Sequence, residues 1–168
     1  ILRQAIEEVC FRAFVFTDGL KAPELVDALG ARAVEGAFGS SPQALEDSEP
    51  AAMFQAAYRA EFGEVPPKPY IDTAYDGVYL LALAAEAAGS TDPAAVREHL
   101  RAVANPPGTK IFPGEWAKAV EVLQDGGEVD YVGASGSVNL DENGDVGGTF
   151  AEWAFEDGEI VVRRVMAP

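Results

Sequence analysis

The sequence contains a single cysteine, so it has neither an internal disulfide framework nor a thiolate zinc site. That residue, Cys10, lies between Val9 and Phe11, and only Arg12 offers a nearby charge that would favour a reactive thiolate. We therefore predict a buried, inert thiol. Histidine is equally scarce, because His99 is the only one and lies among charged residues of a predicted helix. A solvated position is expected for it, and histidine-based catalysis is disfavoured.

Basic residues are few: 12 stand against 28 acidic residues, which gives a formal net charge of −16. Such a charge repels phosphate backbones and anionic lipid headgroups, so we expect neither nucleic acid nor a membrane surface as partner. Long hydrophobic runs are also missing, since the apolar stretch 80–88 is interrupted by Glu86 and stops at Gly89. No membrane span and no signal peptide are predicted, although the chain opens in what reads as the middle of a helix.

The common catalytic motifs are absent as well. The run GASGS lacks the second glycine of a nucleophile elbow, and no dinucleotide-binding or phosphate-binding glycine loop occurs. Carboxylate pairs are frequent, but they are unspecific in so acidic a chain. The sequence therefore predicts no enzyme, no catalytic residue and no cofactor.

One acidic stretch imitates the start of a calcium loop through Asp141, Asn143 and Asp145. An EF-hand loop counted from Asp141 requires glycine at its sixth position and a bidentate glutamate at its twelfth. Glu152 fits the twelfth position, but Val146 stands at the sixth. We favour a polar connector over a metal loop, because Asp, Asn and Gly also dominate turns.

What the chain does contain is a regular succession of helix and strand patterns. With 168 residues, 48% of them hydrophobic, it is long and apolar enough for one globular domain. The predicted elements are a helix at 1–11, strands at 11–19 and 33–41, a helix starting near Pro23 and stopped by Gly30, a helix closed by Gly63, helices at 73–88, after the Asp92 cap and at 115–123, and a hairpin of strands at 149–156 and 159–165. This alternation indicates an α/β protein whose parallel strands are flanked by helices.

Taken in order, several segments resemble the C-terminal half of a type I periplasmic binding protein of the branched-chain amino acid group. The segments are ILRQA, FVFTDGL, VEGAFGSSP, PYIDTAYDGVYLLALAAEAAG and GASGSVNLDENGDVGGTFAEWAF, followed by DGEIV. Proteins of this family are extracytoplasmic receptors of ABC importers. The resemblance implies two α/β lobes joined by hinge strands, with the ligand held in the cleft between them.

The resemblance also implies a division of the chain between the two lobes. Residues 1–38 and 149–168 would form part of the C-terminal lobe and residues 39–148 part of the N-terminal lobe, with DENGD as a hinge connector. The N-terminal half of the family fold is absent from this sequence. We therefore expect either a fragment of a longer receptor or a short form that dimerises through exposed sheet edges.

Ligand-binding residues are implied where the chain matches the family's contact segments. Asp18 follows the FVF strand, where the family's acidic residue receives the ligand's α-ammonium group, and it is flanked by Thr17 and Gly19. A carboxylate at a strand end is also what recognition of a cation requires. The alternative for Asp18 is an Asx-turn with Gly19.

The second contact segment is PYIDTAYD, and its candidates are Tyr70, Asp72 and Tyr75. The alternatives are that Asp72 caps a helix beginning at Thr73 and that Tyr75 belongs to the core. No metal-binding residue is predicted.

The resemblance thus implies a solute-binding protein that captures an amino acid or amide-like ligand and delivers it to the membrane subunits of an ABC permease. The expected location is periplasmic or extracellular, with a lipid anchor conceivable in a longer form. Two alternatives remain: a ligand-sensing domain of a receptor or regulator with the same fold, and a small α/β enzyme without a transport role.

Overall fold

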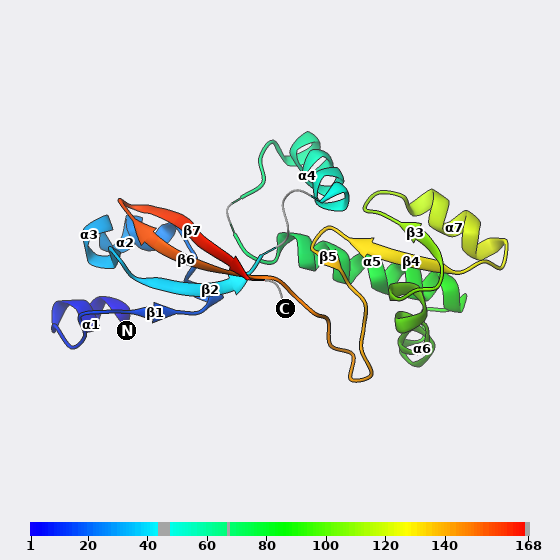
Figure 1. The fold of residues 1–168 in the computed structure, drawn as a ribbon, viewed down its shortest axis with the longest axis horizontal. Coiled ribbons are helices and arrows are strands. Elements are labelled where there is room, and N and C mark those ends of the chain that lie inside the picture. Colours follow the sequence, from blue (N-terminus) through cyan, green and yellow to red (C-terminus); the bar gives the residue numbers. More distant parts are fainter. Residues whose placement is uncertain (44–47, 67, 167–168) are drawn as a thin grey trace. The chain divides into compact units, whose positions relative to one another are not determined.

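The structure, a computed structural model, describes residues 1–43, 48–66 and 68–166 and separates into two compact units (Figure 1). The first unit comprises the described residues of 1–43, 67–69 and 149–168. The second unit comprises the described residues of 44–66 and 70–148. Each unit has its own sheet and its own hydrophobic core.

The first unit is built on a four-stranded sheet with the order β1-β2-β6-β7. Its strands are β1 (Val15–Phe16), β2 (Phe38–Pro42), β6 (Phe150–Glu156) and β7 (Glu159–Met166), and its helices are α1 (Leu2–Glu7), the 3-10 turn η1 (Asp18–Leu20), α2 (Glu24–Leu29) and α3 (Ala31–Val34). The β1–β2 pair is parallel, whereas β2–β6 and β6–β7 are antiparallel. The sheet is therefore mixed, and its last two strands form the predicted hairpin.

One face of this sheet carries the core of the first unit. Trp153 and Phe155 are fully buried there, and Phe16 stacks on Trp153 with ring centroids 6.3 Å apart. Gly39 leaves room for the Trp153 ring, because a Cβ atom at that position would lie 2.8 Å from Cζ2 of Trp153. Side chains of α2, Leu25 among them, complete the cluster.

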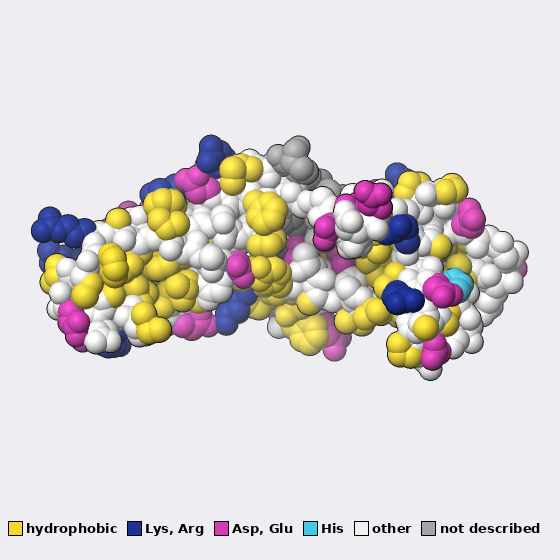
Figure 2. All heavy atoms as spheres, turned by 90° about the horizontal axis from the view of Figure 1, so that it is seen from below, with side chains coloured by type: hydrophobic (Ala, Val, Ile, Leu, Met, Phe, Trp, Pro, Cys, Tyr) yellow, Lys and Arg dark blue, Asp and Glu magenta, His cyan; other side chains and the backbone are white. Residues whose placement is uncertain are grey.

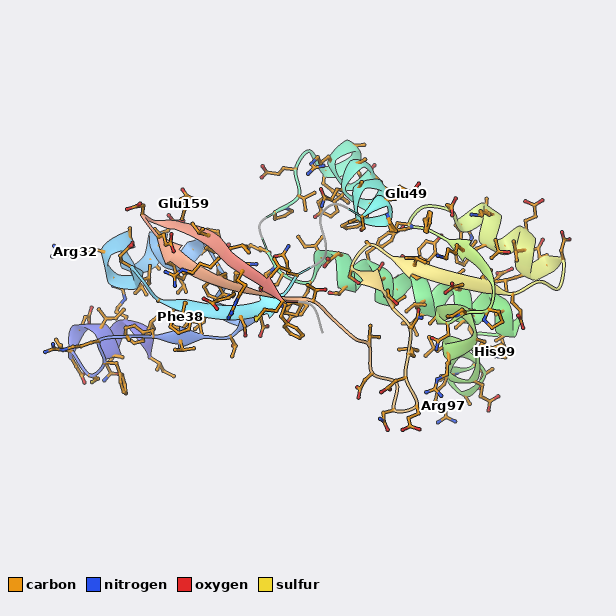
Figure 3. The ribbon with its side chains drawn as sticks, viewed as in Figure 1. Arg32, Phe38, Glu49, Arg97, His99 and Glu159 are labelled. Atoms are coloured by element: carbon orange, nitrogen blue, oxygen red, sulfur yellow. The ribbon has the colours of Figure 1, made fainter. Side chains whose placement is uncertain are left out.

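Several large apolar side chains of the first unit remain exposed. Val15, Phe38 and Val161 lie in register on β1, β2 and β7, and their exposed fractions are 71%, 37% and 37% (Figure 3 for Phe38). Figure 2 shows hydrophobic side chains gathered over this unit. Cys10 is exposed too, so the prediction of a buried thiol is wrong. The helix α1 ends at Glu7 instead of continuing to residue 11, and Val9, Cys10 and Phe11 beyond its end are all exposed.

The second unit packs four helices around a three-stranded sheet with the order β3-β4-β5. The helices are α4 (Glu49–Phe62), α5 (Ile71–Ala88), α6 (Pro93–Ala104) and α7 (Trp116–Gln124), and the strands are β3 (Thr109–Ile111), β4 (Val129–Gly133) and β5 (Gly136–Ser137). Strands β3 and β4 are parallel, and β4 and β5 are antiparallel. Leu83, Ile111 and Tyr131 lie fully buried at its centre.

The α/β class is confirmed, and the element boundaries follow the turn residues. Asp92 caps α6 by accepting the N–H groups of Ala94 and Ala95, and Gly63 and Gly89 end α4 and α5 with positive φ angles. The sequence did not predict β3, β4 or β5, which are short. No helix among the described residues combines the length and the apolar character needed to cross a bilayer.

Candidate functional site

The first candidate site lies at one edge of the sheet in the first unit. Strands β1 and β2 are parallel, so their carboxyl ends meet at the same edge, which is where α/β sheets usually bind ligands. Phe16 is in register with Gly39. The residues that follow each strand residue, Thr17 and Asp18 on one side and Ser40 and Ser41 on the other, therefore lie at this edge.

Asp18 is the acidic residue at that edge. It opens η1, and its backbone carbonyl accepts the N–H of Lys21 at 3.0 Å. The half-buried carboxylate makes no hydrogen bond to any described residue, so the alternative Asx-turn with Gly19 is not formed. Thr17, in extended conformation, and Gly19 flank it and are exposed. The carboxylate oxygens are thus available to a cationic group.

A polar contact that the sequence did not predict lies beside Asp18. The ammonium group of Lys21 donates to the hydroxyl of Ser41 at 3.2 Å and to the side-chain oxygen of Gln43 at 3.4 Å. Ser41 is only 1% exposed, which places a buried hydroxyl at the end of β2. The sequence signal that could have predicted a buried Ser41 is the alternation of side chains along β2, where Gly39 and Ser41 both face inward. The contact ties η1 to β2 and so fixes the loop that carries Asp18.

The second candidate site lies at the start of α5 in the second unit. Tyr70 precedes the helix with a left-handed φ of 74° and is 43% exposed. The helix begins at Ile71, so Asp72 lies within its first turn rather than at the cap predicted before Thr73. One oxygen of Asp72 accepts the N–H of Thr73 at 2.8 Å. The structure thus brings Tyr70 and Asp72 together at one helix end.

Tyr75, the third candidate of this segment, is half-buried between two rings. Its ring centroid lies 5.0 Å from that of Phe54 and 5.6 Å from that of Tyr79. Its hydroxyl accepts the N–H of Gly114 at 3.1 Å, and burial raises its pKa. Tyr75 therefore packs against the core, as the alternative interpretation had it, while its polar end joins α5 to the turn before α7.

The most strongly fixed polar group of the second unit is Asp76, which the sequence did not single out. It is 2% exposed, and its Oδ1 accepts the hydroxyl of Tyr131 and the N–H of Ala134, each at 2.8 Å. Its Oδ2 accepts the N–H of Ser135 at 2.8 Å and the hydroxyl of the same residue at 2.6 Å. Four donors satisfy this buried carboxylate, which joins α5 to the β4–β5 turn. The sequence signal that could have identified it is an acidic residue in the second turn of a mostly apolar helix.

The acidic connector near the end of the second unit is a turn held by the Asp141 side chain and by backbone hydrogen bonds between residues 141 and 145. One Asp141 oxygen accepts the N–H groups of Asn143 and Asp145, both at 2.8 Å, and these bonds lower the pKa of Asp141. Across residues 1–43, 48–66 and 68–166, no group of three or more metal-ligating side chains is found.

His99 is half-buried on α6, with Nδ1 2.9 Å from the carbonyl oxygen of Ala95 (Figure 3).

Comparison with known proteins adds a family match. A family model described as "Periplasmic binding protein" matches residues 13–119. The chain is also 37% identical over 82 residues to a protein of Halobacterium salinarum named "Chemotactic signal transduction system substrate-binding protein BasB", a match that covers 49% of this chain and 20% of that protein.

Two solved structures are similar over nearly the whole chain. The leucine binding protein LivK of Thermotoga maritima matches with a TM-score of 0.68 and 26% identity, over 99% of this chain and 41% of that one. The branched-chain amino acid transporter substrate binding protein LivJ of Streptococcus pneumoniae, solved with isoleucine, matches with a TM-score of 0.65 and 21% identity, over 99% and 40%. The chain therefore has part of their fold and spans well under half the length of each of these three relatives.

Proposed function

The chain belongs to the periplasmic binding protein family, and from that premise we propose that it is part of a non-catalytic receptor for a small amino acid or amide-like ligand. The observation that carries the proposal is the Asp18 carboxylate, which lies at the carboxyl edge of β1 and β2 without a hydrogen bond to any described residue. A ligand ammonium group would supply that missing donor. Thr17 and Gly19 are the proposed neighbours in this contact.

The second unit supplies the other proposed contacts, Tyr70, Asp72 and Tyr75. We propose that 1–38 and 149–168 form part of a C-terminal lobe and 39–148 part of an N-terminal lobe, and that the ligand is captured by lobe closure. Closure would act as a population shift, because a ligand that touches both lobes stabilises the closed state by its differential affinity. The remainder of the family fold, which this chain does not span, would complete both lobes.

The receptor would work outside the cytoplasm, in the periplasm or at the outer cell surface, with a lipid anchor in the longer form. Its proposed partners are the membrane subunits of an ABC permease. Dimerisation of the 168-residue chain through exposed sheet edges is a further proposal, although a net charge of −16 opposes it.

A second candidate function is ligand sensing. The name of the Halobacterium relative, a substrate-binding protein of a chemotactic signal transduction system, favours it. The same lobes would then couple closure to a signalling membrane protein instead of a permease. Reconstitution of the receptor with a permease in vesicles would separate the two roles, because only the transport role predicts ligand accumulation inside the vesicles.

The proposal is tested by titration calorimetry of the full-length receptor with a panel of amino acids, amides and small carboxylates. We expect Asp18→Ala to weaken binding of an α-amino ligand by about 1.5–3 kcal/mol, the range for a hydrogen bond to a charged group. The matched control is Asp27→Ala, which removes an exposed carboxylate from α2 of the same unit. Equal affinity of the Asp18→Ala and Asp27→Ala variants would remove Asp18 from the site.

A further inference from the structure

The second unit contains an apolar pocket of about 190 Å³ between α4, α5 and the turn that precedes α7. Its walls include Phe54, Tyr58 and Phe62 of α4, Tyr75 of α5, and the turn residues Pro113 and Gly114. All of these residues belong to one compact unit. The pocket is therefore a feature of that unit alone and does not depend on lobe closure.

The walls of this aromatic pocket are held in place from two sides. Phe54, Tyr58 and Phe62 recur every fourth residue along α4, and successive ring centroids are 5.7 Å and 4.7 Å apart. On the other side, the hydroxyl of Tyr75 accepts the N–H of Gly114 at 3.1 Å and so holds the turn against α5. Phe62 is 67% exposed, which leaves the end of the row accessible from solvent.

The lining selects for an uncharged guest. Among the residues that the structure describes, no Asp, Glu, Lys, Arg or His side chain lines the pocket, and the Tyr75 phenol is neutral at physiological pH. A charged group placed here would lose its hydration without gaining an ionic partner. An apolar protein cavity of about 150 Å³ holds a benzene molecule, so the volume suits one ring. Tilted aromatic walls favour a ring as guest, since aromatic pairs gain from offset and edge-to-face contacts.

We propose that this aromatic pocket is a binding site for a small uncharged molecule that carries one aromatic ring. It is separate from the ammonium contact proposed at Asp18, which lies in the other unit. The proposed ligand contacts and the pocket lining share only Tyr75. Because Asp18 lies in the other unit, loss of its ammonium contact would not remove the pocket, and the two proposals can fail independently.

The test uses fluorobenzene as probe, followed by its fluorine NMR signal during titration with the full-length receptor. We expect the signal to shift and broaden in a saturable way. Ala57→Leu extends a side chain into the pocket and should weaken binding by about tenfold or more, equivalent to about 1.4 kcal/mol. Ala60→Leu, on the same helix but outside the lining, is the matched control and should leave the affinity unchanged. Leucine is a good helix former, so both variants should fold.

Two further arms define the class of the ligand. Benzenesulfonate, which has the same ring and a full charge, should not bind. Asp18→Ala should leave the fluorobenzene titration unchanged, even if that variant abolishes binding of every amino acid. The proposal is overturned if the wild-type receptor does not bind fluorobenzene, if Ala57→Leu and Ala60→Leu bind it equally, or if benzenesulfonate binds as tightly.

Discussion

Replacing the buried carboxylate of Asp76 by an amide tests the polar centre of the second unit. The Asp76→Asn side chain keeps its shape and one oxygen, but its NH₂ group must face two of the four donors that now surround the carboxylate. Two hydrogen bonds to a charged acceptor are lost, each worth about 1.5–3 kcal/mol. The Ser135 hydroxyl can rotate and accept a hydrogen bond from the new NH₂ group, which restores part of the lost free energy of unfolding. We therefore expect the free energy of unfolding of this unit to fall by about 2–4 kcal/mol.

Urea unfolding can report on this unit alone, because the chain has two tryptophans and they lie in different units. Trp116 packs edge-on against Tyr79 with centroids 5.9 Å apart, so its fluorescence follows the second unit in a Trp153→Phe background. Asp72→Asn, four residues earlier on α5, is the matched control and should change stability by about 0.5 kcal/mol or less. An unchanged midpoint for Asp76→Asn, with an unchanged slope, would refute the assignment of Asp76 as the centre of this network.

The remaining predictions concern the same core and one helix cap, and all are measured by urea unfolding. Gly133→Ala should destabilise the second unit by about 1–3 kcal/mol, because its Cβ would lie 2.4 Å from Oδ2 of Asp76. Gly77→Ala, in open space on α5, should instead stabilise it by about 0.4–1 kcal/mol, and two effects of equal sign would contradict the geometry. Burial raises the pKa of Tyr79 to about 12 and also raises that of Tyr131, whereas an unfolded tyrosine titrates near 10. The stability that these phenols contribute is thus complete below about pH 10 and is lost above it. The urea concentration at the midpoint of unfolding should therefore decrease as the pH is raised from about 10 to 12. Tyr131→Phe should flatten that fall, and a midpoint independent of pH up to 11.5 would contradict the burial of both phenols. Asp92→Ala should cost about 1 kcal/mol and Asp92→Asn much less, because the cap needs one oxygen acceptor for the N–H groups of α6.

The sequence predicted most of the elements because their ends carry local signals. Glycine at the ends of α4 and α5 and the Asp157-Gly158 turn of the hairpin act through positive φ angles. Aspartate before α6 acts through side-chain hydrogen bonds to the first N–H groups of the helix. Strands β3, β4 and β5 have only three, five and two residues and were missed, whereas the equally short β1 and β2 lie within the longer runs 11–19 and 33–41 that were predicted as strands. Runs that short give little periodicity, and they become strands through pairing with one another.

The candidate site was predictable only in part, because hydrogen-bond partners are distant in sequence. Asp18 and Asp72 could be placed at the ends of a strand and a helix from their neighbours alone. By contrast, the partners of Asp76 come from residues 131–135, and the partner of Lys21 comes from β2. Periodicity places such residues on a face of an element but does not say which donor lies opposite.

The positions of Tyr75 and Asp76 connect the proposed site to the core of the second unit. Asp76 is fixed by four hydrogen bonds and Tyr75 by one hydrogen bond and two ring contacts, so the first turns of α5 are held on both sides. Tyr70 and Asp72 lie within six residues of Asp76, on or next to that same helix. A contact residue mounted on a fixed helix loses less conformational entropy on binding than one carried by a mobile loop. Asp76→Asn should therefore weaken ligand binding through the placement of Tyr70 and Asp72, although Asp76 itself, at 2% exposure, cannot touch a ligand.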